Sequence, residues 1–558
     1  MNNSAVTELD NLLQKNIDSL KEKGLKNDQK AIIQLVRTMD YYLLGSMFGN
    51  ERSKKILKHY CYGWGIAFNV FIDKAIDNDN VPSFKSNDRL IWWADALLDY
   101  CNVLGVLKQC IDHSKTGLAT VEKLADEEFQ VRYSNNTIMG VEAIEREEFF
   151  WHNEFITRTQ ATQANSLGSS AKDIHESMKK LVFISRGYFL GYDTTPEIDT
   201  FYFKLSKLEI QKKMGYDSFP PNTLFGEYTY EFYLEALCIL SSFSLKHLGF
   251  ASNQLAKGGE CNSVNLVQLF TLKSDTAESL SKAMQIDVET ANKFIDIFTL
   301  QDVNKTYACS KVNGPIPPLI KISSNHILYF HSGFMAQPVL FMLGELRRHY
   351  QKDWDRALDK REEIFRNDLY SLFPLDRFLK INRPIVIKLD RKVLTDIDGF
   401  IYDQDTGTLA LFQLKWQEPF ANSMFERNSR KKNFEQESTH WIEAISNWLL
   451  DKSSEELASS FGLKSNAFKD YKRSRLFVIG RNFSQFSGNE LPDERAAWGM
   501  WPQLMRLLLE NSYTENDTLN CLFNLLIKDS PIGKAKKRNE DFENQIIDMD
   551  GYRIKMIT

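Results

Sequence analysis

Residues 395–416 read TDIDGFIYDQDTGTLALFQLKW, and this stretch decides how the C-terminal part of the chain is interpreted. Apolar residues recur with a period of two in the runs Thr395–Tyr402 and Leu409–Trp416, and a polar segment separates these runs. Such alternation is typical of β-strands, and Gly407 can adopt the positive φ that a tight turn needs. The stretch therefore predicts two antiparallel strands joined by a short turn.

The polar side chains of this predicted hairpin share faces. Side chains alternate along a strand, so Asp396 and Asp398 point the same way, as do Gln413 and Lys415. Pairing across the turn is expected to bring Asp398 beside Gln413 and Lys415. A carboxylate, an amide and an ammonium group would then meet at one point of an otherwise apolar sheet.

This combination of groups suits phosphodiester hydrolysis. The reaction needs a divalent cation that polarises the phosphate and a water made nucleophilic near neutral pH. Mg²⁺ takes oxygen ligands, usually one or two carboxylates with waters and phosphates. Asp398, the side-chain oxygen of Gln413 and the main-chain carbonyl of Leu414 are candidate ligands for Mg²⁺ or Mn²⁺. Lys415 is the candidate group to orient the water or stabilise developing charge.

The sequence around the hairpin predicts alternating helices and a few strands. Helical spacing covers residues 352–373, 433–450 and 497–510, and strand-like runs cover 384–389 and 475–479. The resulting order is helix, three strands, helix, strand, helix. An α/β sandwich with a small mixed sheet explains this order best, so the expected fold class of the whole chain is α+β.

Ile397-Asp398-Gly399 followed by Gln413-Leu414-Lys415 resembles the PD-(D/E)XK nuclease superfamily, and most closely its Mrr-like restriction endonucleases. In that group an IDG word precedes a QxK word, with glutamine in place of the usual acid. The resemblance covers roughly Trp354–Leu509, and the family's α-β-β-β-α-β core agrees with the predicted order. It implies a metal-dependent endonuclease acting on DNA rather than RNA, in bacterial restriction or anti-phage defence.

The resemblance also implies a glutamate on the helix before the first strand that completes the metal site. The helix offers Glu362 and Glu363. Helical spacing puts Glu362 on the expected buried face and Glu363 beside it. The apolar residues that define this face are Leu358, Phe365, Leu369 and Leu372. We therefore expect Glu362 as the further ligand, with Glu363 as the alternative.

A basic run follows the third strand. Four of its cations, Arg427, Arg430, Lys431 and Lys432, accompany a single acid, Glu426. Because phosphate contacts supply most non-specific affinity for nucleic acid, these four residues are candidate phosphate contacts. The alternative is an ordinary solvated helix start.

The rest of the chain gives a coarser expectation. Residues 1–312 show mostly helical spacing and predict a large all-α region that senses, binds or oligomerises, although the polar segment 157–171 looks like a loop. Residues 313–350 predict a hairpin and a connecting helix, residues 351–530 the nuclease-like domain, and residues 531–558 a tail.

Composition limits the class of protein. The chain has 558 residues, 43% of them hydrophobic and 26% charged, which excludes a disordered chain. The net charge of −5 excludes a basic field over the whole protein, but not a local basic groove. Seven cysteines form no CxxC pair, and the N-terminus has no signal-like apolar run. We expect a cytoplasmic protein without a membrane partner.

Two other functions fit the same sequence. The C-terminal domain could bind nucleic acid or a partner without cutting it, or it could be part of a helical scaffold. The partners expected for the nuclease are nucleic acid and either further copies of the chain or another defence protein. Lys415→Ala separates these alternatives, since only an enzyme keeps binding while it loses cleavage.

Overall fold

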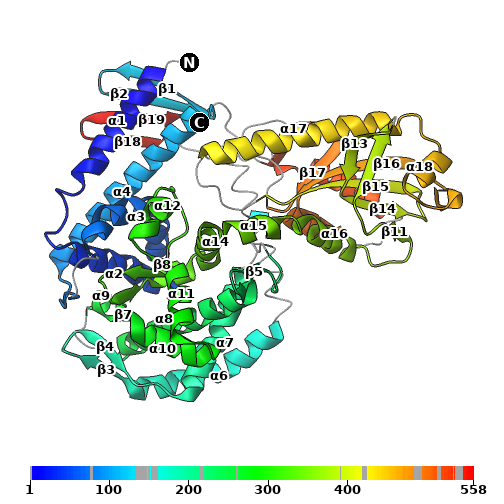
Figure 1. The fold of residues 1–558 in the computed structure, drawn as a ribbon. Coiled ribbons are helices and arrows are strands. Elements are labelled where there is room, and N and C mark those ends of the chain that lie inside the picture. Colours follow the sequence, from blue (N-terminus) through cyan, green and yellow to red (C-terminus); the bar gives the residue numbers. More distant parts are fainter. Residues whose placement is uncertain are drawn as a thin grey trace. The chain divides into compact units, whose positions relative to one another are not determined.

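The computed structural model divides the chain into two compact units (Figure 1). One unit comprises Met1–Asp112 and Asn153–Trp354, and the other comprises His113–His152 and Asp355–Thr558. The described residues are 3–75, 80–133, 147–148, 151, 161–213, 219–258, 262–389, 391–417, 424–468, 470–482, 493–511, 517–531, 533–534 and 545–557.

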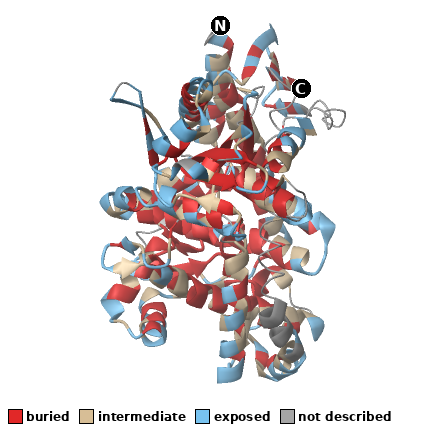
Figure 2. Ribbon diagram, turned by 90° about the vertical axis from the view of Figure 1, so that its right-hand side faces the viewer, coloured by how far each residue is buried: buried red, intermediate tan, exposed pale blue. Residues whose placement is uncertain are grey.

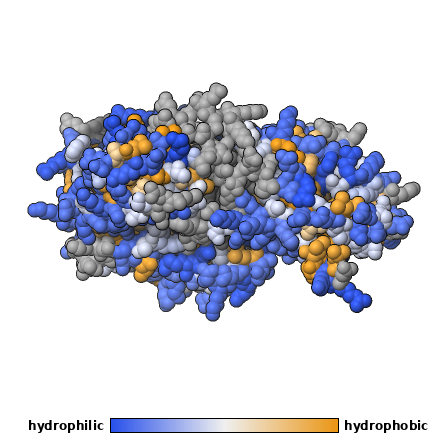
Figure 3. All heavy atoms as spheres, turned by 90° about the horizontal axis from the view of Figure 1, so that it is seen from above, coloured by the Kyte–Doolittle hydropathy of each residue, from blue (hydrophilic) through white to orange (hydrophobic). Residues whose placement is uncertain are grey.

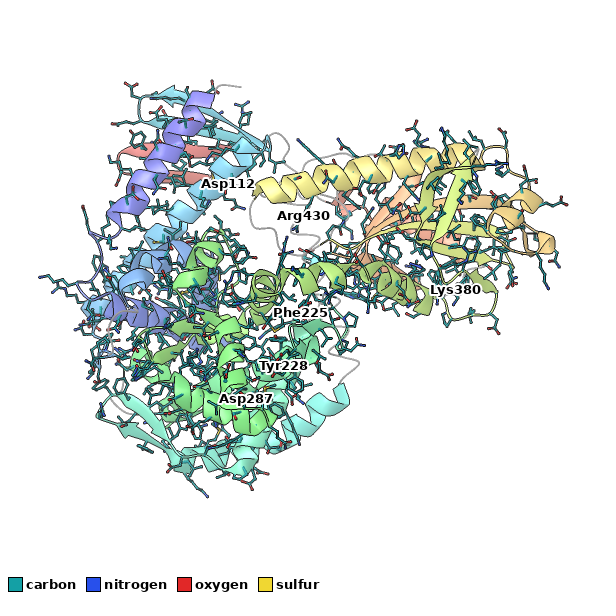
Figure 4. All side chains as sticks on the ribbon, in the orientation of Figure 1. Asp112, Phe225, Tyr228, Asp287, Lys380 and Arg430 are labelled. Carbon is teal, nitrogen blue, oxygen red and sulfur yellow. The ribbon has the colours of Figure 1, made fainter. Side chains whose placement is uncertain are left out.

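The first unit is built mainly from helices, several of which begin at a capping side chain. Asn27 caps α2 by accepting a hydrogen bond of 2.8 Å from the Lys30 main-chain N–H. Asp287, labelled in Figure 4, caps α11 by accepting one of 2.8 Å from the Thr290 N–H. Such caps satisfy N–H groups that have no partner within the helix. The helices are α1 (Asn3–Ser19), α2 (Asp28–Met47), α3 (Glu51–Ala75), α4 (Asp88–Lys115), α6 (Ala161–Leu181), α7 (Pro196–Lys212), α8 (Tyr230–Ala256), α9 (Ser263–Leu266), α10 (Lys273–Met284), α11 (Val288–Ile297), α12 (Asp302–Cys309), α13 (His331–Met335) and α14 (Pro338–His349). The next helix, α15 (Gln351–Leu358), spans the boundary between the units.

The coarse prediction of a mixed α and β protein is confirmed, but the all-α prediction for residues 1–312 is wrong. Eight of the described strands lie in this region: the hairpin of β1 (Ala119–Ala125) and β2 (Glu128–Tyr133), two shorter hairpins, and the strands β7 (Leu269–Leu272) and β8 (Thr299–Leu300). Strands of two to four residues are too short to give a recognisable period-two pattern. The strands of the two shorter hairpins are β3 (Val182–Ser185) with β4 (Phe189–Tyr192), and β5 (Leu224–Phe225) with β6 (Tyr228–Thr229).

The polar segment 157–171, predicted as a loop, is helical from Ala161 onward as part of α6. Further along this helix, Ile174 and Met178 pack in a core cluster that includes Tyr202. Tertiary packing of this kind outweighs weak local propensity. Residues 157–160 lie outside the described residues.

The hairpin and helix predicted for residues 313–350 are confirmed, although the hairpin belongs to a larger sheet. That sheet has the order β7-β10-β9-β8. The whole segment therefore belongs to the first unit, which ends at Trp354 rather than at residue 350. The strands are β7 (Leu269–Leu272), β8 (Thr299–Leu300), β9 (Leu319–Lys321) and β10 (His326–Tyr329), and the helix is α14.

The central feature of the second unit is a five-stranded mixed sheet of order β11-β14-β15-β16-β17. β14 is antiparallel to β11 and β15, whereas β15, β16 and β17 are parallel to one another. A mixed sheet agrees with the sequence prediction, but the strand expected over 384–389 is β12 (Ile385–Leu389), which lies outside this sheet, and the edge strand β11 was not predicted. The strands of the sheet are β11 (Phe378–Lys380), β14 (Gly399–Asp403), β15 (Thr408–Lys415), β16 (Arg473–Gly480) and β17 (Ala496–Met500).

Helices cover both faces of this sheet, and each face has its own core. On one face, Trp441 of α17 packs with Phe400 and Leu411. On the other, Phe365 of α16 packs with Phe412. Figure 2 marks such buried positions in red. The helices are α16 (Arg361–Ser371), α17 (Met424–Leu449), α18 (Ser454–Ser460), α19 (Trp501–Asn511) and α20 (Thr518–Lys528).

Three elements of the second unit differ from their predictions. The helix expected over 352–373 is two helices, α15 and α16, and the strand expected over 395–402 is divided at Asp398 into β13 (Lys392–Ile397) and β14. β13 pairs with β12 (Ile385–Leu389) in a separate two-stranded ribbon. β17 occupies the start of a predicted helix, because a strand buried throughout shows no alternation.

The segment 531–558, expected to be a tail, contains two strands of a further sheet. β18 (Gln545–Met549) pairs with β19 (Tyr552–Ile557), and β19 runs parallel to β2 (Glu128–Tyr133), which pairs with β1 (Ala119–Ala125). Residues from the two ends of the second unit's sequence therefore form one sheet of order β1-β2-β19-β18.

Two helices, α4 and α8, are long and apolar enough by length and composition to cross a membrane. Within their most apolar windows, 44% and 72% of residues are buried inside the protein. This is weak evidence for insertion, because core helices pass the same test. On the face drawn in Figure 3, apolar side chains occur in small groups within a mainly hydrophilic surface.

Candidate functional site

The strand register brings Asp398 opposite Gln413, as the sequence predicted. Gly399 pairs with Phe412 in the antiparallel ladder of β14 and β15, so the next position joins Asp398 to Gln413. The Asp398 main-chain N–H donates a 3.1 Å hydrogen bond to the Phe412 carbonyl. The candidate site therefore lies where β13 bends away and the central sheet ends on that side.

At this point the Asp398 carboxylate, and not a main-chain carbonyl of β14, accepts hydrogen bonds from β15. Its Oδ2 accepts hydrogen bonds from Gln413 Nε2 at 2.6 Å and from the Leu414 main-chain N–H at 2.8 Å. Only 2% of Asp398 and 6% of Gln413 is exposed. A main-chain donor that has lost its strand partner is thus satisfied by a side chain, which holds the carboxylate in one orientation.

Burial raises the pKa of Asp398 to about 7. The Leu414 N–H and the Lys415 charge oppose this rise, whereas the charges of Glu362 and Asp396 add to it. Desolvation and like charges both penalise an ionised carboxyl group. A cation at this position would reverse the penalty, so the local electrostatics favour cation binding.

Lys415 shares the face of Gln413, which is covered by α17. Its Nζ donates a 3.0 Å hydrogen bond to Glu437 Oε2. The Lys415 side chain is 27% exposed and that of Glu437 is 62% exposed. A solvent-exposed ion pair contributes little free energy, so the ammonium group can exchange this partner for a phosphate at small cost.

The prediction that Glu362 lies on the buried face of its helix is wrong. Glu362 and Glu363 are both exposed, although Arg361, Phe365 and Arg366 around them are buried. The face was inferred partly from Leu358, which belongs to α15 and not to α16. The negative charge of Glu362 nevertheless contributes to the raised pKa of Asp398.

Two residues of α16 hold the bend at Asp398 and were missed in the sequence. Arg366 Nε donates to the Asp398 carbonyl at 2.7 Å. The Tyr370 hydroxyl accepts from the Phe400 main-chain N–H at 2.9 Å and donates to the Ile381 carbonyl at 2.8 Å. In the sequence, Arg366 and Tyr370 are marked only by their four-residue spacing, which puts two polar side chains on an otherwise apolar face of the helix.

Gly399 allows α16 to approach the sheet closely. A Cβ atom at this position would lie 3.0 Å from Leu369 Cδ2 and 3.2 Å from Phe412 Cβ. The glycine of the IDG word therefore has a packing role beside the aspartate. Figure 4 labels Lys380, whose Nζ donates to the Tyr370 and Phe373 carbonyls at the end of α16, at 3.2 and 2.7 Å.

The predicted phosphate contacts belong to the first half of α17. Arg430, labelled in Figure 4, is half-buried, and Lys432 is exposed. The side chains of Arg427 and Lys431 lie outside the described residues. The two described cations of the basic run lie on the same helix as Glu437.

The donor set at the site fits Mg²⁺ or Mn²⁺ by its chemistry. The described residues contain no group of three or more His, Cys, Asp or Glu side chains that could hold a metal ion. The candidate set has instead two carboxylates, Asp398 and Glu362, with the amide oxygen of Gln413 and the carbonyl of Leu414. Mg²⁺ binds commonly through one or two carboxylates and completes its shell with waters and phosphates.

Comparison with known proteins gives no match to this chain among family models, curated proteins or solved structures. The interpretation of the site therefore depends on its own residues.

Proposed function

We propose that the chain is a metal-dependent endonuclease of the PD-(D/E)XK type, closest to the Mrr-like restriction endonucleases. The order of α16, β11, β14, β15, α17 and β16 supports this, because it is the α-β-β-β-α-β order that the resemblance implies. The hairpin β12–β13 is an insertion in that order. The observation that carries the proposal is the buried Asp398–Gln413 pair with Lys415 on the same strand face.

Each residue has a role that follows from its surroundings. Asp398, Gln413 and Glu362 would hold Mg²⁺ or Mn²⁺, with the Leu414 carbonyl as a further oxygen. The bound cation supplies Lewis-acid polarisation of the phosphate and lowers the pKa of a water. Lys415 contributes a positive charge that orients the water or stabilises charge on the phosphate. Arg366 would keep Asp398 in position through its main-chain carbonyl, and Tyr370 through the Phe400 N–H two residues later.

A substrate panel tests this proposal. The full chain is incubated with plasmid, linear duplex DNA, single-stranded DNA and RNA, in Mg²⁺, Mn²⁺ or EDTA. The proposal predicts cutting that requires the cation, that is lost in Asp398→Asn, and that favours DNA over RNA. Binding without cutting under every condition would contradict it and favour the non-cutting module.

The proposed cellular role is restriction or anti-phage defence in the bacterial cytoplasm, and it is derived from the family resemblance. Phage plating on cells that express the chain tests this role. The proposal predicts fewer plaques with the wild type and normal plating with Asp398→Asn. Equal plating with both proteins, at equal expression, would contradict the defence role and leave the nuclease proposal in place.

A further inference from the structure

The hairpin β12–β13 is a ribbon that separates from the central sheet immediately before Asp398. Its ladder runs from the pair Ile385–Ile397 to the pair Leu389–Lys392, with an irregularity after Ile387. Two residues lie between the strands in the sequence, a length typical of hairpin connections. Arg391 in this turn has a φ of 68°, whereas Asp390 lies outside the described residues.

The base of the ribbon is anchored in the core. Ile385, Ile387 and Ile397 are buried in the cluster formed with α17. The indole N–H of Trp441 on α17 donates a 2.7 Å hydrogen bond to the Asp396 carbonyl. The ribbon is therefore held against the same helix that carries Glu437, the partner of Lys415.

The outer half of the ribbon combines cations with exposed apolar side chains. Leu389 is 56% exposed and Val393 is 66% exposed. Lys388, Arg391 and Lys392 are also exposed, and none of them forms an ion pair within the part of the chain that the structure describes. Three cations accompany one acid between residues 388 and 392. This end of the ribbon thus presents positive charge that no described acid neutralises.

We propose that the β12–β13 ribbon enters a groove of double-stranded DNA, which makes the duplex the substrate of the nuclease. A two-stranded ribbon fits the major groove of B-DNA, about 12 Å wide. The three cations would contact phosphates, and Leu389 and Val393 would contact base edges such as the thymine methyl group. This inference rests on the proposed function, because it needs a nucleic-acid substrate at Asp398.

The strand length sets the distance of these contacts from the cut. Asp398 follows Lys392 by six positions in the sequence, so the two residues lie at most about 20 Å apart along a strand. Base pairs rise about 3.4 Å each, so the ribbon tip reaches roughly 6 base pairs from the scissile phosphate.

Charge favours DNA over a second copy of the chain as the occupant. A symmetric contact between two ribbons would bring the same cations of each copy together. Like charges across an interface oppose association, whereas phosphates complement them. The exposed apolar side chains alone do not distinguish these occupants, so the experiment includes both.

The test removes the three charges without disturbing the turn. In Lys388→Gln/Arg391→Gly/Lys392→Gln, glycine accepts the positive φ of residue 391. The matched control is Lys464→Gln/Lys472→Gln/Arg473→Gln, which removes three exposed cations of the same unit; Arg473 pairs with Thr408, at the opposite end of β15 from Gln413. Binding of each full-length protein to a duplex and to a single strand is measured in EDTA over a range of salt concentrations.

The inference predicts that the ribbon variant loses affinity for the duplex. The slope of the logarithm of the association constant against the logarithm of the salt concentration should be less negative than in wild type by about 2 to 3. The control variant should keep the wild-type slope. Phosphate ethylation roughly 6 base pairs from the cut should interfere with wild-type binding but not with the ribbon variant.

Three outcomes would overturn the inference. Equal slopes for the ribbon and control variants would exclude phosphate contacts by the ribbon, while metal-dependent cutting by wild type would leave the nuclease proposal standing. Cutting of single strands only would exclude the duplex. A change in sedimentation of the ribbon variant with unchanged DNA binding would assign the ribbon to contact between copies.

Discussion

Gln413 donates a buried hydrogen bond of 2.6 Å from its side-chain amide to the carboxylate of Asp398. The amide nitrogen is thereby committed to Asp398, which leaves the amide oxygen as the group of Gln413 that could bind a cation. A neutral amide also avoids placing a second negative charge against a carboxylate whose pKa burial already raises to about 7. Gln413 therefore both orients Asp398 and limits the charge of the site.

Gln413→Glu is expected to destabilise the metal-free protein. It replaces the donor to Asp398 with a second carboxylate, at a cost of about 1–3 kcal/mol. The added charge should also tighten Mg²⁺ binding, so Mg²⁺ should raise the melting temperature more than in wild type. Thermal unfolding with EDTA and with Mg²⁺ measures both effects. Gln404→Glu, which adds the same charge on an exposed turn, is the control. Equal melting temperatures of the two variants in EDTA and in Mg²⁺ would contradict the prediction.

The stability of the metal-free protein should depend on pH through Asp398. Its folded pKa of about 7 lies above the unfolded value of 3.8, so the folded state keeps a proton that the unfolded state loses. The contribution of this proton to the free energy of unfolding is fully present below about pH 4 and is lost as the pH rises through about 7. The total loss is at most about 4 kcal/mol.

Asp398→Asn removes this contribution. The difference in melting temperature between variant and wild type should therefore grow in favour of the variant from about pH 4 to above pH 7, without metal. Taking the difference cancels other titrating groups, such as Asp40, whose pKa burial also raises to about 7. A difference that does not vary with pH would show that Asp398 ionises normally.

Lys415→Ala should lower the cleavage rate by about 10²–10³-fold and leave the fold intact. Its ion pair with Glu437 is largely exposed, so the free energy of unfolding should change by less than about 1 kcal/mol. Single-turnover rates and urea unfolding measure the two quantities, with Lys464→Ala as control. A large loss of stability would assign Lys415 a structural role instead.

Tyr370→Phe should destabilise the second unit by about 1–3 kcal/mol, because the Phe400 N–H and the Ile381 carbonyl lose their buried partner. We also expect slower cleavage, since the strand start that carries Asp398 loosens. Tyr471→Phe removes a hydroxyl bonded to Ser474 and is the control. Wild-type cleavage by a destabilised Tyr370→Phe protein would show that the hydroxyl does not position Asp398.

The parts of the site that the sequence predicted depend on local geometry. Period-two alternation and a glycine turn are sufficient to bring Asp398 opposite Gln413, because a short hairpin fixes the register. The expected burial of Glu362 was wrong. Phe365 and Leu369 of the predicted face are buried, but Glu362 lies in the first turn of α16, which begins at Arg361 after the break from α15, and its side chain is exposed. Contacts such as that of Arg366 with the Asp398 carbonyl join elements far apart in sequence, and no local pattern encodes them.

The central claim is that Asp398, Gln413 and Lys415 form a metal-dependent phosphodiesterase site. Single-turnover cleavage of an end-labelled duplex by wild type, Asp398→Asn, Lys415→Ala and the exposed control Asp405→Asn, each in Mg²⁺ and in EDTA, tests this most directly. We predict Mg²⁺-dependent cutting by wild type and Asp405→Asn, no cutting by Asp398→Asn, and cutting slowed by about 10²–10³-fold in Lys415→Ala. Undiminished Mg²⁺-dependent cutting by folded Asp398→Asn would contradict the account.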